Sequence, residues 1–144
     1  MRVLAVDFGE KRIGLAVSDD AGRIVVPVGS VSRTNDARAA ADVAHAAKER
    51  EVARLVVGLP RNLDGTEGLL ARRARNFARR LSDASGLPVD LHGEALTSAD
   101  AERDLRAAGV PAGRRAAARD AEAAAVLLRD WLASHAGPRP GAPP

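Results

Sequence analysis

Short apolar runs near the N-terminus predict strands, and they are separated by polar turns. The runs at residues 2–7, 12–18 and 23–31 are typical of strands buried in a sheet. The Asp-Ala-Gly turn at 20–22 separates the second run from the third, so we expect these strands to pair antiparallel. Pro27 has no amide proton to donate, which predicts that the third strand is an edge strand.

The rest of the chain follows mainly the period of a helix. Residues 36–50 place Ala40, Val43 and Ala47 on one helical face, with Asn35 as the expected N-cap. Two more strands are expected at 54–58 and 88–92, and further helices at 67–84, 97–107 and 117–134. In the helix at 67–84 the apolar stripe comprises Leu70, Ala74, Phe77, Ala78 and Leu81. Asp64 or Thr66 is the expected cap of that helix.

This order of elements predicts an α/β fold with a five-stranded mixed sheet and helices on both faces. The chain has 144 residues, so we expect one domain over 1–136 and a disordered Pro/Gly-rich tail over 137–144. The first strand should be central, and sites in such sheets lie at the carboxyl ends of the central strands. Asp7, at the end of that strand, is therefore expected in the site.

Composition narrows the function classes. The chain has no cysteine, which excludes a disulfide scaffold, a thiol nucleophile and Cys-based zinc sites. The longest apolar runs are far short of the roughly 20 residues that span a bilayer, and Asp7 interrupts the N-terminus where a signal peptide needs apolar residues. We therefore expect a soluble cytoplasmic protein with no membrane partner.

The basic residues are almost all arginine. There are 22 Lys and Arg against 19 Asp and Glu, and only Lys11 and Lys48 are lysines. Arginine makes bidentate contacts with phosphate, so nucleic acid is a candidate partner, although a GC-rich genome gives the same bias. The candidate phosphate contacts lie in the first turn and in and before the helix at 67–84: Lys11, Arg12, Arg61, Asn62, Arg72, Arg73, Arg75, Arg79 and Arg80.

Three acids are candidates for chemistry. Asp7 ends the first strand, Glu94 follows the fifth, and Asp120 extends the apolar stripe of the last helix. Taken singly, they also fit a turn aspartate, a solvated loop acid and a first-turn acid that favours the helix dipole. Together they cannot share a pocket in ionised form without a counter-ion, and their oxygen atoms suit Mg²⁺ or Mn²⁺. The glycines of the turn at 8–14 are expected to let a ligand approach the backbone.

Four blocks of the sequence resemble the YqgF/RuvX family. They are VLAVDFGEKRIG at 3–14, VVGLPRNLDGTE at 56–67, EALTS at 94–98 and DAEAAAVLL at 120–128. Members of this family are described as Holliday-junction resolvases and as nucleases that process the 5′ end of 16S rRNA precursor. The resemblance covers residues 2–134 and implies an RNase H-like fold, with Asp7, Glu94 and Asp120 as catalytic metal-binding carboxylates. Gly93 and Ala95 depart from the family pattern, in which an acid and an arginine flank the glutamate.

The resulting hypothesis is an Mg²⁺- or Mn²⁺-dependent endonuclease that hydrolyses phosphodiester bonds. Its substrate is expected to be 16S rRNA precursor, with the pre-ribosome as a further expected partner and branched DNA as the alternative substrate. Two other functions stay open: a non-catalytic ribosome-assembly or nucleic-acid-binding factor, and a nucleotide-binding half-module like those of actin-like ATPases. The expected oligomeric state is a monomer or a homodimer.

Overall fold

The computed structural model describes residues 1–60, 66–94 and 112–135. For residues 94 and 112–114 it describes the backbone alone. Its strands are β1 (Val3–Phe8), β2 (Arg12–Ser18), β3 (Val25–Ser32), β4 (Arg54–Pro60) and β5 (Val89–Glu94). Its helices are α1 (Asp36–Glu49), α2 (Leu69–Ser85) and α4 (Ala112–Ser134). The predicted helix at 97–107, the tail at 137–144 and the loop residues Arg61, Asn62 and Asp64 lie outside the described residues.

The five strands form one mixed sheet in the order β3-β2-β1-β4-β5. The first three strands form an antiparallel meander, while β4 and β5 run parallel to β1. The prediction of a five-stranded mixed sheet with a central first strand and an edge third strand is therefore confirmed. The carboxyl ends of β1, β4 and β5 consequently meet at one end of the sheet.

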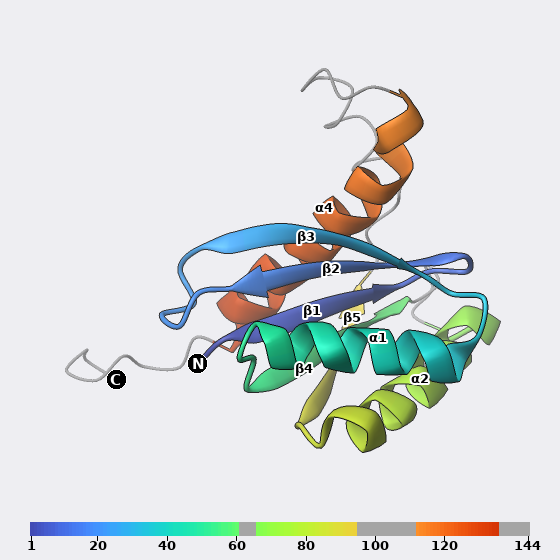
Figure 1. Cartoon of the computed structure of the whole chain (residues 1–144), viewed down its shortest axis with the longest axis horizontal. Helices are drawn as coiled ribbons and strands as arrows, with labels where there is room; N and C mark the ends of the chain where they lie inside the picture. The colour runs from blue at the N-terminus through green and yellow to red at the C-terminus, as the bar shows by residue number, and fades with distance from the viewer. Residues whose placement is uncertain (61–65, 95–111, 136–144) are drawn as a thin grey trace.

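Alternate residues of the central strand face two different layers of helix. Leu4, Val6 and Phe8 pack with α1 and α2 on one face. Val3 and Ala5 pack with α4 on the other, so that helices cover both faces as predicted (Figure 1). This strict alternation is the two-residue period of a strand buried on both sides. It places Asp7, which follows Val3 and Ala5 in the same row, on the α4 face.

Helices α1 and α2 begin differently. The side chain of Asn35 accepts a hydrogen bond from the amide of Arg38 at 3.0 Å, which confirms the predicted cap of α1. Helix α2 begins instead after Gly68, which provides no side-chain cap, so the prediction that Thr66 caps this helix is wrong. Its predicted apolar stripe is largely confirmed: Ala74, Phe77, Ala78 and Leu81 are buried, and Ala71 joins them while Leu70 is partly buried.

Helix α4 begins at Ala112, earlier than the predicted residue 117, because Gly113 lies within the helix instead of breaking it. Asp120 therefore lies in the third turn, and its interpretation as a first-turn acid stabilised by the helix dipole is wrong. The apolar stripe predicted beyond it is confirmed as buried: Ala124, Leu127, Leu128 and Trp131.

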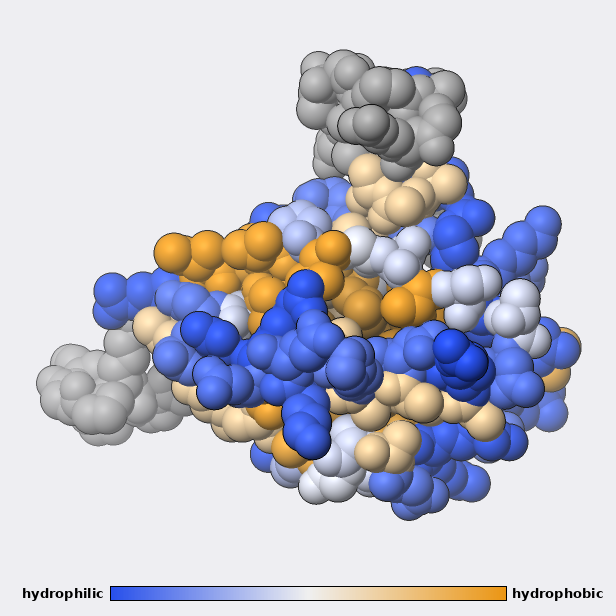
Figure 2. All heavy atoms as spheres, viewed as in Figure 1, coloured by the Kyte–Doolittle hydropathy of each residue, from blue (hydrophilic) through white to orange (hydrophobic). Residues whose placement is uncertain are grey.

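The outer strand β3 is a protected edge with an exposed apolar patch. Pro27 pairs with Ala16, and a register shift between Leu15 and Ala16 marks a bulge next to it. Proline and bulges both discourage the pairing of an edge strand with another chain. Ile24 and Val26 are exposed at 61% and 51%, and the apolar surface over this strand is visible in Figure 2.

The predicted turn between β2 and β3 is present. Gly22 has a φ of 70°, and its amide donates to the carbonyl of Asp19 at 3.2 Å. The Asp19 carboxylate accepts from the amides of Ile24 and Arg23, and these hydrogen bonds lower its pKa. Among the described residues, no helix is both long and apolar enough to cross a membrane.

Phe77 is expected to anchor α2 to the sheet. It is fully buried, and its ring centroid lies 5.0 Å from that of Phe8. We predict that Phe77→Ala lowers the free energy of unfolding by about 3–5 kcal/mol in chemical denaturation, because it leaves a cavity in the core. Asn76→Ala, at an exposed position of the same helix, should change it by less than about 0.5 kcal/mol. A tolerated Phe77→Ala would mean that α2 is not packed against the sheet as described.

Candidate active site at the carboxyl end of the sheet

Asp7 lies at the end of the sheet where the parallel strands finish. It is the last residue but one of β1, it is half-buried, and it follows a fully buried run from Val3 to Val6. Its register partner on β2 is Gly14. Residues that face each other in an antiparallel pair have their Cα atoms about 5 Å apart and project to the same face. Asp7 and Gly14 therefore belong to the α4 face.

Gly14 is the point at which α4 touches this part of the sheet. A Cβ atom at Gly14 would lie 1.9 Å from the carbonyl oxygen of Asp120. Only a residue without a side chain allows this approach. The expectation that this glycine admits a ligand is therefore wrong, because the backbone of α4 occupies the space.

These two contacts bring two of the three predicted acids together. Asp7 is opposite Gly14, and Asp120 is stacked on Gly14, so the two aspartates flank one position on the sheet. One comes from the central strand and the other from a helix more than 100 residues later. The sequence predicted that all three acids converge on one point, and that convergence stays a prediction beyond the backbone placement of these two.

Asp120 forms an ion pair with Arg12. Nε of Arg12 donates to Oδ2 of Asp120 at 2.6 Å, and the exposed fractions of the two side chains are 36% and 18%. Arg12 is the first residue of β2 and lies two positions before Gly14. The apolar helix stripe thus ends in a carboxylate that is compensated across the sheet, as burial of a charge requires.

Glu94 is the last residue of β5 and its backbone pairs with Pro60. Its side chain lies outside the described residues. One strand, β4, lies between β5 and β1, so these two strands are roughly 10 Å apart. Its strand ends at the same end of the sheet as Asp7, but its proximity to the two aspartates remains a prediction.

The turn between β1 and β2 is held by a buried arginine that the sequence did not single out. Arg33 lies 4.2 Å above the ring of Phe8 and donates to the carbonyls of Gly9 and Glu10 at 3.3 and 2.8 Å. Its Nε donates to Asp36 at 2.9 Å, and its side chain is only 9% exposed. No spacing in the sequence distinguishes this arginine from the 19 others.

Gly9 serves the turn itself. Its amide donates to the carbonyl of Arg12 at 3.0 Å, and a Cβ atom at Gly9 would lie 2.5 Å from that oxygen. The carbonyl oxygen of Arg12 thus occupies the space beside Gly9 that was expected to admit a ligand. Together with Arg33, this glycine presents the turn residues Lys11 and Arg12 in a defined conformation.

A shallow depression beside Asp120 gathers positive charge. Its lining residues include three cations and one acid, and they come from the β1–β2 turn and the end of β3: Glu10, Lys11, Arg12, Ser30, Ser32, Arg33 and Thr34. Hydroxyl groups and guanidinium groups are the donors that phosphate oxygens take. Arg12 lines the depression and also pairs with Asp120, so the depression adjoins the candidate site.

The predicted phosphate contacts of α2 divide into two groups. Arg72, Arg73, Arg79 and Arg80 are exposed. Arg75 is half-buried and pairs with Glu67, with both Nε and Nη2 near the same oxygen at 2.8 and 2.7 Å. The exposed four are available to a polyanion, whereas Arg75 would first have to leave its partner.

His92 is a second residue near the site that spacing did not reveal. It pairs with Gly58, which lies one residue beyond the segment of β4 that pairs with β1. Its Nε2 lies 2.5 Å from Oδ2 of Asp130. Its side chain is 15% exposed. Asp130 comes from the same helix as Asp120, so this contact ties the far end of α4 to β5.

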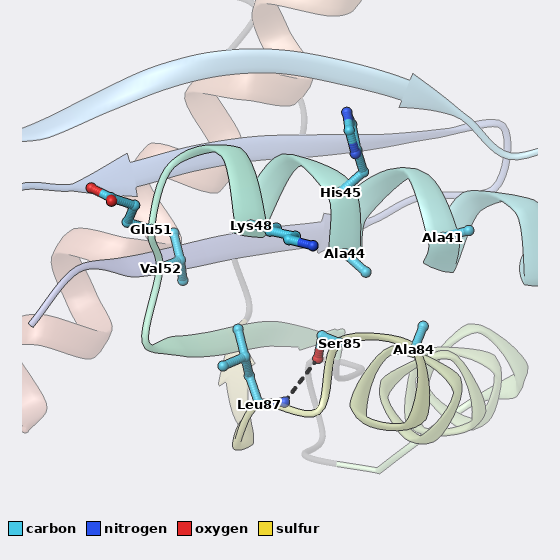
Figure 3. Close-up of a pocket in the computed structure, with 9 residues that line it drawn as sticks. All are labelled: Ala41, Ala44, His45, Lys48, Glu51, Val52, Ala84, Ser85 and Leu87. Atoms are coloured by element: carbon cyan, nitrogen blue, oxygen red, sulfur yellow. Dashed lines mark hydrogen bonds between the residues drawn. The ribbon is translucent and has the colours of Figure 1, made fainter.

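A groove between α1 and α2 has no comparable chemistry. Its lining combines three alanines, Val52 and Leu87 with four polar residues, which are His45, Lys48, Glu51 and Ser85 (Figure 3). His45 points away from α2, and the Ser85 hydroxyl accepts a hydrogen bond from the amide of Leu87 at 3.1 Å. Binding sites need polar groups that converge on a ligand, and these do not.

The donor chemistry of the aspartate pair suits a hard cation. Carboxylate oxygens are the ligands that Mg²⁺ and Mn²⁺ prefer, and two of them flank Gly14. Among the described residues, no group of three histidines, cysteines or acids forms a complete metal site. The third predicted ligand, the Glu94 side chain, is outside that set, so the fit concerns the pair alone.

Comparison with known proteins identifies the sequence family. A family model described as "RuvX: Holliday junction resolvase" matches residues 1–134. A protein of Anaeromyxobacter dehalogenans named "Putative pre-16S rRNA nuclease" is 52% identical over 132 residues, which cover 92% of this chain and 96% of that protein. A protein of the same name from Myxococcus xanthus is 40% identical over 138 residues and covers 96% and 91%.

Solved structures agree on the fold. RuvC of Thermus thermophilus has a TM-score of 0.58 at 15% identity and covers 94% of this chain and 97% of its own. The fowlpox virus resolvase, in a complex with Holliday junction DNA, has a TM-score of 0.55 at 10% identity and covers 92% and 99%. The predicted RNase H-like fold is confirmed.

The contact at Gly14 should control both stability and the site. We predict that Gly14→Ala lowers the free energy of unfolding by at least about 1–3 kcal/mol, because its methyl group must displace the backbone of α4. The same displacement moves Asp120 away from Asp7, so nucleic-acid cleavage should fall more than unfolding alone explains. Denaturation curves and cleavage rates measured below the transition would check this. Parent-like stability would show that α4 is not held against β2 at this residue.

Proposed function

The chain belongs to the RuvX family, and we propose that it is a metal-dependent endonuclease that processes the 5′ end of 16S rRNA precursor. The observation that carries this proposal is the family match over the whole described domain, with relatives named as pre-16S rRNA nucleases at up to 52% identity. The aspartate pair at the carboxyl end of the sheet supports it, because a phosphodiesterase of this kind needs clustered carboxylates.

Asp7, Glu94 and Asp120 would hold Mg²⁺ or Mn²⁺. Such cations would supply stabilisation of the attacking and leaving oxygens in a displacement at phosphorus. Asp7 would be a central ligand because it comes from the central strand and lies opposite Gly14, against which the backbone of Asp120 packs. The apolar stripe behind Asp120 keeps this carboxylate in one place.

The arginines would bind the substrate. Lys11 and Arg12 line the depression beside the aspartates, and the exposed arginines of α2 offer a second basic surface. Arg61 and Asn62 belong to the same proposal through their position before α2. Phosphate contacts of this type orient a nucleic acid without reading its sequence.

Two alternatives follow from specific observations. The family description names a Holliday junction resolvase, so branched DNA is the second candidate substrate. Gly93 and Ala95, which replace an acid and an arginine of the family pattern, keep open a factor that binds RNA or the pre-ribosome without cleaving. Either role with rRNA would place the protein in the cytoplasm. The proposed oligomeric state is a monomer or a homodimer.

The substrate can be decided by parallel cleavage assays. A pre-rRNA 5′-leader and a four-way DNA junction would be incubated with the protein and Mg²⁺, Mn²⁺ or EDTA. The proposal expects metal-dependent cleavage of the RNA at its 5′ boundary. Cleavage of the junction alone would support the resolvase, and binding of RNA without cleavage would support the assembly factor.

Asp7→Asn tests the metal site. Without metal, we predict that this variant is at least as stable as the parent, because it relieves repulsion among the acids. With Mg²⁺ it should lose cleavage almost completely and still bind nucleic acid. Added Mn²⁺ should raise the melting temperature of the parent more than that of the variant. An Asp7→Asn protein that is destabilised by about 1 kcal/mol or more and still cleaves would instead identify Asp7 as a turn aspartate held by backbone amides.

The arginines of α2 should determine the salt dependence of binding. We predict that Arg72→Ala and Arg79→Ala each weaken binding and reduce the slope of log affinity against log salt by about 0.9 for a duplex, one phosphate contact each. Arg38→Ala is the control, since Arg38 is 79% exposed but paired with Asp42 on α1. Unchanged affinity and slope in the α2 variants would assign that surface to solvent.

A further inference from the structure

The ion pair between Arg12 and Asp120 engages one of the candidate metal ligands directly. Oδ2 of Asp120 accepts from Nε of Arg12 at 2.6 Å, so one carboxylate oxygen faces the guanidinium. The Asp120 side chain is only 18% exposed, and solvent screens this charge incompletely. Arg12 therefore supplies countercharge directly to the Asp120 carboxylate.

The position of Arg12 makes this role specific. Arg12 and Gly14 share one face of β2, and Gly14 fixes the backbone of Asp120 while Arg12 fixes its carboxylate. Asp7 is the register partner of the same Gly14 on β1. Asp120 thus has a cation beside its carboxylate and its backbone at the point of the sheet where a second acid lies.

The Arg12 guanidinium can also move away from Asp120 toward solvent. Arg12 is 36% exposed and lines the basic depression with Lys11 and Ser32. Nε is engaged, and the terminal amino groups lie at the other end of a planar fork with further donors. Movement away from Asp120 would therefore leave Arg12 at a solvent-accessible surface and would not bury an unpaired charge.

We propose that Arg12 is an internal counter-ion of the site, which stabilises Asp120 while no divalent cation is bound and which the cation must overcome to bind. This inference rests on the proposed function, since it assumes that Asp120 is a metal ligand. It assigns Arg12 a positioning role through Asp120 in place of a simple phosphate contact. Arg12 keeps the carboxylate in position and lowers the affinity of the empty site for cations.

Loss of the Arg12 charge should lower stability without metal and raise the affinity for a cation. Loss of the Arg12 charge should destabilise the metal-free protein, because Asp120 then lies beside Asp7 without compensation. The same loss should strengthen cation binding, because a unit positive charge a few ångströms from a divalent ion opposes it. A residue with a merely structural role would lower stability and cation affinity together.

The test is a Mn²⁺ titration by calorimetry, with melting curves in EDTA and in Mn²⁺. For Arg12→Gln we expect a lower melting temperature than the parent in EDTA, a Mn²⁺ dissociation constant about tenfold smaller, and a larger rise in melting temperature on addition of Mn²⁺. Arg12→Lys, which keeps the charge, should return both quantities toward those of the parent.

Arg54→Gln is the matched control. Arg54 pairs with Asp90 at 2.7 Å with exposed fractions of 30% and 31%, at the amino ends of β4 and β5. It should lower the melting temperature in EDTA and leave the Mn²⁺ dissociation constant unchanged.

The outcomes separate this inference from the proposed function. If the parent binds Mn²⁺ and Arg12→Gln binds it equally or more weakly, the counter-ion role is wrong while the metal site stands. If Arg54→Gln also binds Mn²⁺ more tightly, the effect is one of overall charge, and the counter-ion role is again wrong. A parent that binds no Mn²⁺ would overturn both the metal-dependent function and the role of Arg12.

Discussion

The close approach of α4 to β2 at Gly14 is the constraint on which the site depends. A side chain at this position would overlap the carbonyl of Asp120 at 1.9 Å, so the helix can lie here only because glycine has none. Because Gly14 is also the register partner of Asp7, the same packing contact places two aspartates from distant parts of the chain at one point of the sheet. Stability and function are coupled at this point because the same backbone contact serves both.

Charge compensation follows from that arrangement. An acid at the end of an apolar stripe must be paired, and β2 provides Arg12 from the same face that provides Gly14. Arg33 performs a different task one strand away, where it is buried over Phe8 and holds the turn that presents Arg12. The two arginines thus have unlike roles: one compensates a candidate ligand, and the other supports the backbone.

Much of the fold could be predicted from the sequence because periodicity reports burial. The run before Asp7 is apolar at every position since both faces of β1 are covered, and the stripe beyond Asp120 is the buried face of α4. The start of α4 could not be predicted, because Gly113 is tolerated within the helix against its intrinsic preference. The hydrogen bonds of Arg33 to the turn and of His92 to α4 could not be predicted either, because their acceptors are backbone carbonyls or lie far away in sequence. The two glycines were assigned to a ligand because a sequence shows where space is needed but not what fills it.

The similarity to RuvC at 15% identity concerns the fold alone, whereas a protein named as a pre-16S rRNA nuclease is 52% identical. A shared fold does not by itself determine the substrate. Discrimination between RNA and branched DNA therefore has to come from surfaces outside the shared core. In this chain the described candidates are the basic depression formed by the β1–β2 turn and the end of β3, and the exposed arginines of α2. The depression touches the aspartates through Arg12, whereas the α2 surface lies on the opposite face of the sheet from α4. A substrate that contacts both must extend around the carboxyl end of the sheet, which favours a long or folded nucleic acid over a mononucleotide.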